Sequence, residues 1–197
     1  MEFPDFFATT RHDVFRAVYA ATGTRAGAED AVAEAYARAF AHWATVAAHP
    51  NPTAWVLRTA LNVQRSLWRR LRREALTGSP PEPAAGEAGS SLLDRQIRAA
   101  VQALPRRQRE VVALRLLADL SADETAALLG LAPATVHVHL HRALGQLRRH
   151  LDPGSSGGGT TTGEVTAEAP AETGGVITFA VADLGLASLV RAVRHAY

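Results

Sequence analysis

Five polar side chains at helical spacing in residues 53–73 are the first group in this chain that could bind a charged ligand. They step by four, three, four and three residues: Arg58, Asn62, Arg65, Arg69 and Arg72. On a helix this spacing places them along one face, and a helix of this length can follow several base pairs. A solvated helix face usually alternates its charge signs, but residues 53–73 contain no acid. The pattern therefore favours a nucleic acid over plain solvation.

A second group of candidate DNA contacts lies in residues 133–151. Apolar residues recur there at helical spacing and predict one buried stripe: Val136, Leu140, Leu144, Leu147 and Leu151. The opposite face carries side chains that can reach phosphates or base edges. The candidates for DNA contact in this segment are Thr135, Val136, His137, His139, Arg142 and Arg149. Arg142 is the leading one, because arginine is the best bidentate partner of guanine.

The residues just before this segment predict a helix-turn-helix. Ser121 and Glu124 have the spacing of a capping box, which satisfies the free N–H groups at the start of a helix. Gly130 lies where the chain must turn sharply, and Pro133 can begin the next helix because its missing N–H costs nothing there. Such an arrangement lays its second helix into the DNA major groove. The alternative is an ordinary helical hairpin inside a bundle.

Metal binding and catalysis are both disfavoured by the residue pattern. Among His137, His139 and His141, only His137 and His141 could share an ion on a helix, and no obvious third ligand accompanies them. The chain contains no cysteine, and we find no glycine-rich phosphate loop and no nucleophile–base pair. We therefore expect no metal site and no cofactor, and we do not expect an enzyme.

The N-terminal residues predict a helical block. Aromatic and aliphatic residues recur at three- and four-residue spacing from Phe3 onwards, and Thr22-Gly23 ends this first helix. A second helix is expected to open with Glu29 and Asp30 in its first turn, where the helix dipole favours acids. Its apolar stripe predicts a core position for Val32, Tyr36, Phe40 and Trp43.

Residues 44–52 should form a loop between this helix and the arginine-bearing helix. They contain His49-Pro50-Asn51-Pro52, and consecutive X-Pro pairs disfavour helix. The arginine-bearing helix then runs from Thr53 to about Arg73, with Leu57, Ala60 and Leu61 on its buried side. The predicted fold class is all-α.

Two stretches rich in glycine and small polar residues divide the chain. Residues 77–91 and the stretch that begins at Asp152 are nearly free of large apolar residues and are typical of flexible linkers. We therefore expect two small helical domains, a linker between them, a second linker and a tail: 1–76, 77–91, 92–152, 153–175 and 176–197. Apolar residues of the tail predict a short strand near Val176–Val181 and a short helix near Leu186–Val193. One hypothesis is that this tail packs on one of the domains and regulates access to DNA or to a protein partner. The alternative is a dispensable end or a docking peptide for another partner.

Basic charge is concentrated in the two domains. Residues 1–76 hold ten arginines against seven acids, and residues 92–152 hold nine against six, although the whole chain has a formal net charge of only +2. A protein that touches DNA at two places requires this distribution. No apolar run approaches the roughly 18 residues that span a bilayer, and the N-terminus lacks the pattern of a signal peptide. We expect a cytoplasmic protein without membrane insertion.

Three passages together resemble the bacterial RNA polymerase sigma factors of the compact extracytoplasmic-function (ECF) group. They are Ala28-Glu29-Asp30-Ala31-Val32-Ala33-Glu34-Ala35-Tyr36, Asn51-Pro52-Thr53-Ala54-Trp55-Val56-Leu57-Arg58, and Leu104-Pro105-Arg106-Arg107-Gln108-Arg109-Glu110-Val111-Val112. The third runs into the helix-turn-helix. Each passage is weak to moderate alone, but their order and separation make the combination specific. The resemblance covers about residues 5–151.

The resemblance implies a promoter reader that works when bound to core RNA polymerase. Asp30 and Glu34 would dock on the polymerase clamp. The −10 element would be engaged and melted by Asn51, Asn62, Arg65, Arg69 and Arg72. The helix that starts at Pro133 would read the −35 element. Anti-sigma proteins are common in the group, so the resemblance adds one as a candidate partner beside promoter DNA.

The chain departs from the pattern of the resembled group in two ways. The residues after Val136 are usually basic or small and polar, but here they are His137, Val138 and His139. The usual polar helix cap before Pro133 is Ala132, a poor capping residue. Both departures bear on which promoter is read. The rival hypothesis is a self-sufficient helix-turn-helix regulator that binds an operator as a dimer, which would not need the arginine helix of a separate N-terminal domain.

Overall fold

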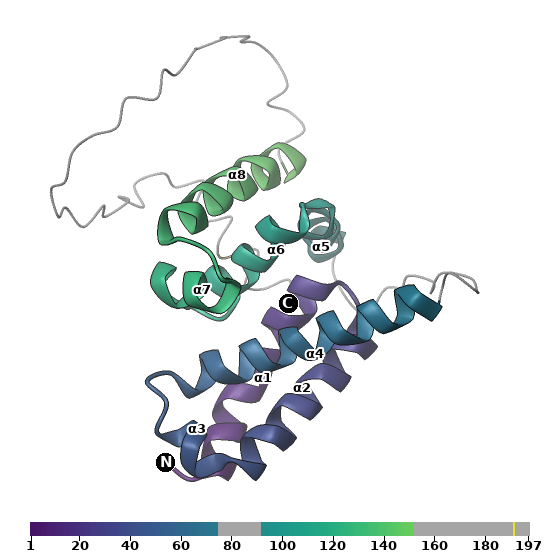
Figure 1. Ribbon diagram of the computed structural model, residues 1–197. Coiled ribbons are helices and arrows are strands. Elements are labelled where there is room, and N and C mark those ends of the chain that lie inside the picture. Colours follow the sequence, from purple (N-terminus) through teal and green to yellow (C-terminus); the bar gives the residue numbers. More distant parts are fainter. Residues whose placement is uncertain (75–91, 152–190, 192–197) are drawn as a thin grey trace, which may run out of the picture.

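A computed structural model describes residues 1–74, 92–151 and 191, with only the backbone for residues 68–74. Within these ranges every regular element is helical, which confirms the predicted all-α class. The expectations for the linkers and for the tail from residue 153 onwards concern segments outside the described residues. Two groups of helices make up the described part (Figure 1): α1 to α4 from the N-terminal block, and α5 to α8 from the C-terminal block.

The N-terminal block is a bundle of three long helices and one short helix. These are α1 (Phe3–Thr22), α2 (Arg25–Ala41), α3 (Trp43–Ala47) and α4 (Pro52–Glu74). Helices α1, α2 and α4 pack against one another. Fully buried alanines line the contact between α1 and α2, and their small side chains let the two helices approach closely: Ala17, Ala20, Ala28, Ala31, Ala35 and Ala39.

Helix α1 ends as the sequence predicts, but α2 begins earlier than expected. Gly23 has φ of +85°, a left-handed conformation that suits glycine and stops α1 after Thr22. Thr24 is extended and α2 starts directly at Arg25, so its first turn contains no acid. The prediction that Glu29 and Asp30 open this helix is therefore wrong. Only two residues separate the helices, because Gly23 reverses the chain in a single step.

A short helix also interrupts the predicted loop of residues 44–52. Trp43 begins α3, which ends at Ala47, so only the second half of this segment lacks helix. The X-Pro pairs lie at Pro50 and Pro52 and leave residues 43–47 free to form one helical turn. The following helix α4 starts at Pro52, where a missing N–H costs nothing.

Aromatic rings cap one end of the N-terminal bundle. Phe6 and Tyr36 are buried, and the ring of Trp43 packs on Phe6 with 5.0 Å between ring centroids. Burial raises the pKa of the Tyr36 phenol to about 12, while the hydroxyls of Thr10 and Tyr36 share a hydrogen bond of 2.8 Å. Phe40, predicted to lie in the core, is 66% exposed. The neighbouring Ala39 is buried instead, which directs Phe40 towards solvent, where its ring packs on that of Phe3 with 5.0 Å between ring centroids.

The C-terminal block contains the predicted helix-turn-helix. It consists of α5 (Leu92–Ala103), α6 (Arg106–Val112), a π-helical turn η1 (Ala113–Leu117), α7 (Ala122–Leu129) and α8 (Pro133–Leu151). The capping box at Ser121 is confirmed, since its Oγ accepts from the Glu124 N–H and the Glu124 carboxylate accepts from the Ser121 N–H. Gly130 turns the chain with φ of +67°. Val136, Leu144 and Leu147 are buried, so the predicted stripe of α8 faces the core.

The two blocks pack against each other in this structure, which the sequence did not predict. Helix α1 contacts α5, α6 and η1, and α4 contacts α7. Figure 1 shows the C-terminal helices resting on the side of the bundle formed by α1 and α4. The contact brings the arginine-bearing helix next to acidic residues of the other block.

Candidate nucleic-acid interface

Helix α4 carries the polar residues that the sequence predicts along one helix face, which we call the cationic stripe. Arg58 and Asn62 are exposed, and Arg65 is partly buried at the contact with the C-terminal block. Arg69 and Arg72 belong to the same helix, but their side chains lie outside the described part of the chain. Leu57, Ala60 and Leu61 form the buried side of α4, as the spacing predicts. The described members of the stripe therefore extend from solvent into the interface between the blocks.

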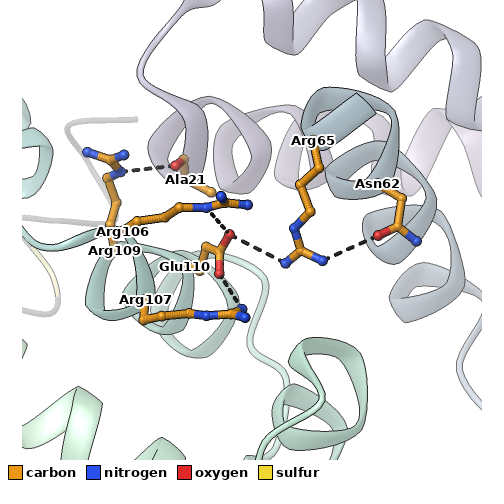
Figure 2. A network of polar contacts seen from close by, with 7 residues as sticks. All are labelled: Ala21, Asn62, Arg65, Arg106, Arg107, Arg109 and Glu110. Carbon is orange, nitrogen blue, oxygen red and sulfur yellow. Dashed lines mark hydrogen bonds and ion pairs between the residues drawn. The ribbon is translucent and has the colours of Figure 1, made fainter. Parts of the chain in front are cut away.

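Arg65 reaches across the interface to the carboxylate of Glu110 on α6. Its Nη2 lies 3.4 Å from Glu110 Oε1, and its Nη1 donates to Asn62 Oδ1 at 3.3 Å. Glu110 is only 3% exposed. Arg106 and Arg107 bind the same carboxylate at 3.0 and 2.9 Å, as Figure 2 shows. A buried carboxylate needs such partners, because its desolvation is costly without compensating charge and hydrogen bonds.

Asn51 makes two contacts at the start of α4. Its Oδ1 accepts from the Ala54 N–H at 2.9 Å, which caps the helix. Its Nδ2 donates to Glu124 Oε1 of α7 at 2.6 Å. This hydrogen bond from Asn51, together with those from Ser121, holds the pKa of the Glu124 carboxyl below its ordinary value of 4.5. The capping glutamate of the helix-turn-helix thus also binds a residue expected to touch the −10 element.

Two further contacts fix the C-terminal block to the end of α1. Gln102 Nε2 donates to the carbonyl of Ala20 at 3.1 Å, and Arg109 Nε donates to the carbonyl of Ala21 at 3.0 Å. The Arg109 contact is drawn in Figure 2. These carbonyls belong to the last turn of α1, where no further intrahelical N–H is available to them. The interface therefore provides hydrogen-bond donors for carbonyl groups that have no donor within helix α1.

Helix α8 presents its outer face away from the N-terminal block (Figure 1). Of the candidate DNA contacts, His137, Arg142 and Arg149 are exposed and Thr135 is partly exposed. Val136 is 0% exposed and packs in the core, so its side chain has no access to DNA here. His139 is partly buried, and its Nδ1 is enclosed.

The sequence analysis did not include three exposed residues of α8 among the DNA contacts. Ala134, Val138 and His141 lie on the outer face, beside His137 and Arg142. Helical spacing could have identified these three residues, because none of them falls on the buried stripe of α8. Positions 134 and 138 are four residues apart and share the face of Arg142, four residues further on.

The acids expected to bind a protein partner lie on α2. Asp30 and Glu34 are both exposed, and Glu34 Oε1 accepts from Arg38 Nε at 2.7 Å. Both acids line an open hollow of about 550 Å³ between α2 and α4, together with Asn62 and Ser66. The candidate protein-binding acids and a candidate DNA contact therefore share one surface.

The described residues bring together no group of three or more histidine, cysteine, aspartate or glutamate side chains suited to a metal ion. Likewise, none of the helices in the described ranges has the length and apolar character needed to cross a bilayer.

Two family models match the chain, one on each block. Residues 6–74 match Sigma-70 region 2, and residues 94–147 match Sigma-70 region 4. Together they take in both the cationic helix and the helix-turn-helix.

Among similar proteins, the RNA polymerase sigma-E factor of Streptomyces coelicolor is 32% identical over 153 residues, which cover 77% of this chain and 86% of that protein. The ECF RNA polymerase sigma factor EcfG of Rhodopseudomonas palustris is 31% identical over 130 residues, covering 64% of this chain and 72% of that protein. Among solved structures, the sigma factor RpoE of Bartonella quintana, crystallised with the anti-sigma factor NepR, has a similar fold. The TM-score is 0.68 at 23% identity, with 76% of this chain and 96% of that chain covered.

Proposed function

This chain belongs to the RNA polymerase sigma factors of the extracytoplasmic-function group, which direct core RNA polymerase to promoters, and we propose how its residues divide that work. Residues 1–76 dock on the polymerase and engage the −10 element. Residues 92–152 read the −35 element. The observation that carries the proposal is the presence, in one chain, of a cationic helix without an acid in residues 53–73 and a capped helix-turn-helix.

Polymerase docking is assigned to Asp30 and Glu34. Both carboxylates are exposed on α2 and border the open hollow lined by residues of α2 and α4. Exposed acids on a rigid helix can form charge-assisted hydrogen bonds with basic residues of a partner. Support comes from their position in the segment matched by the Sigma-70 region 2 model.

Contact with the −10 element is assigned to Asn51, Asn62, Arg65, Arg69 and Arg72. The arginines supply attraction to the phosphate backbone, and the two amides can bind bases that have left the stack. Asn62 is exposed and available, whereas Asn51 and Arg65 are held by Glu124 and Glu110. Binding of the −10 element through these two residues therefore requires the blocks to separate.

We propose that the packed arrangement is the form free of DNA. Beside the apolar contact of α1 with η1, the interface contains hydrogen bonds and an ion pair whose partners a nucleic acid can replace. It is also incompletely filled, since a hollow of about 260 Å³ remains beside Asn51 and Asp13. Phosphates of the promoter would replace the carboxylates as partners of the arginines.

Reading of the −35 element is assigned to α8. Thr135, His137, His139, Arg142 and Arg149 are the proposed contacts, with Arg142 as the principal base contact and Arg149 as a phosphate contact. Val136 supports this face from the core, because its side chain is buried.

The direct test is run-off transcription with purified core RNA polymerase on a promoter library. The proposal predicts RNA from defined start sites only when this chain is added. An absence of specific RNA at every promoter contradicts it. Footprinting separates the rival regulator hypothesis: an operator-binding dimer protects DNA by itself, whereas we expect specific protection only with core polymerase present.

A further inference from the structure

The outer face of α8 contains one large apolar side chain among polar ones. Val138 is 46% exposed, while Val136, two residues earlier, is completely buried. Ala134, His137, His141 and Arg142 are the exposed residues around it. Single exposed apolar residues are common on protein surfaces, so exposure alone decides nothing. The position is what matters, because Val138 stands four residues before Arg142 on the face that is directed to DNA.

The chemistry of valine limits what it can read in a major groove. An isopropyl group neither donates nor accepts a hydrogen bond. Placed against a polar base edge, it would remove water from a donor or acceptor without replacing the lost hydrogen bond. Among the four bases, only thymine presents an apolar group in the major groove, its C5 methyl. An exposed valine on the reading face therefore fits thymine and disfavours cytosine, whose amino group would lose its partner.

We propose that Val138 is a specificity-determining residue that contacts the C5 methyl group of a thymine in the −35 element. This inference rests on the assignment of α8 as the −35-reading helix. It gives the α8 face two complementary contacts: Arg142 binds a guanine edge through hydrogen bonds, and Val138 recognises a methyl group nearby through apolar contact.

Replacement of single thymines by deoxyuridine tests the contact, since deoxyuridine differs from thymidine only by the absent methyl group. The −35 sequence is first defined by run-off transcription of a promoter library with the full chain and core polymerase. Each thymine of that sequence is then replaced in turn, and the rate of open-complex formation is measured. At one thymine we expect the rate of open-complex formation to fall about fourfold, because the free energy of burying one methyl group corresponds to a factor of that size.

The Val138→Ala variant, which lacks both γ-methyl groups of valine, should show less discrimination between the thymine and deoxyuridine templates than the native chain. Folding is not at risk, because the side chain is half exposed and alanine favours helix. Leu93→Ala, which trims another exposed apolar residue on α5, serves as the matched control and should keep the fourfold discrimination.

Three outcomes overturn the proposal while leaving the sigma function intact. In the first, promoter-specific transcription is unaffected by deoxyuridine at every thymine. In the second, the −35 sequence contains no thymine. In the third, Val138→Ala weakens both templates equally and keeps the discrimination. If no promoter-specific RNA is made by the native chain, the proposed function itself fails.

Discussion

The two helices proposed to contact DNA, α4 and α8, differ in whether their polar side chains already have partners. On α4, Arg65 is bound to Glu110, and Asn51 at its start is bound to Glu124. On α8, by contrast, Arg142 and Val138 face solvent. The acids that hold the α4 side belong to the same block as α8. The C-terminal block therefore leaves the outer face of its helix α8 exposed while it covers part of the polar side of α4.

This difference has a consequence for the order of events at a promoter. An exposed α8 can meet the −35 element without rearrangement of the chain. Arg65 and Asn51, the proposed −10 contacts, become available only after Glu110 and Glu124 move away. A ligand shifts the equilibrium between packed and separated blocks only if it binds the separated form more tightly. In our proposal, polymerase and DNA both offer groups that compete for Arg65 and Asn51.

The largest expected effect is on stability, from Glu110→Gln. This variant removes the charge of a carboxylate that is 3% exposed and leaves three guanidinium groups around a neutral amide. We expect a loss of about 1.5–3 kcal/mol in the free energy of unfolding, the usual contribution of hydrogen bonds to a charged group, because the three guanidinium groups are themselves partly exposed and can be hydrated. Urea denaturation followed by circular dichroism measures it.

Glu29→Gln is the control for that variant, because Glu29 forms an exposed ion pair with Arg25 at 2.9 Å. Its effect should be no more than about 0.5 kcal/mol. Equal losses for the two variants would show that the Glu110 cluster is not a buried network.

Arg142→Ala should leave stability unchanged and impair promoter recognition. The side chain is exposed on α8, and a bidentate contact to guanine contributes about 1–3 kcal/mol of discrimination, or about 5- to 150-fold. The rate of open-complex formation with core polymerase reports the effect. Arg95→Ala, which removes an exposed arginine from α5, carries the same charge change and should have little effect. A similar defect in both variants would mean that only bulk charge matters.

Asn51 allows helix capping to be separated from the contact between the blocks. Asn51→Ala loses both, and we expect about 1 kcal/mol of destabilisation. Asn51→Asp keeps a good capping residue but places a second carboxylate against Glu124, where the present hydrogen bond is 2.6 Å long. The Asp variant should therefore remain folded but separate the blocks, which small-angle X-ray scattering would detect as a larger radius of gyration. An unchanged radius would contradict a role for this contact in holding the blocks together.

The smallest effect is a pH dependence that originates at Glu124. Hydrogen bonds from Asn51 and Ser121 lower its pKa in the folded state below 4.5. The stability from these bonds is present above the ordinary pKa and is lost as the pH falls through the lowered one. Compared with Glu124→Gln, the native chain should lose additional stability only on the acid side of pH 4.5. Parallel acid profiles for the two proteins would exclude this contribution.

Local patterns predicted the elements that carry the candidate sites. The capping box at Ser121, the turn at Gly130 and the buried side of α4 follow from spacing within a few residues of the chain, and the structure confirms them. Phe40 was placed wrongly, because an apolar stripe does not reveal that the smaller Ala39 fills the close contact between helices.

The contact between the blocks could not be predicted in this way. Arg65 and Glu110 are 45 residues apart, and Asn51 and Glu124 are 73 apart. Helical periodicity describes one element at a time and contains no information on which distant element will cover it. The same limit explains why Arg65 was expected to be available for DNA, when the structure binds it to a buried acid.

The separation of the two blocks can be measured directly, because the chain contains no cysteine and two introduced ones would be labelled selectively. Ala8 on α1 and Ala127 on α7 are exposed and have no proposed contact with DNA or polymerase. With spin labels at both positions, pulsed electron paramagnetic resonance should give one narrow distance distribution in the free chain, set by the packed arrangement. A longer distance should replace it when core polymerase and promoter DNA are added. An unchanged distance in the full complex would contradict the claim that the −10 contacts are released by separation of the blocks.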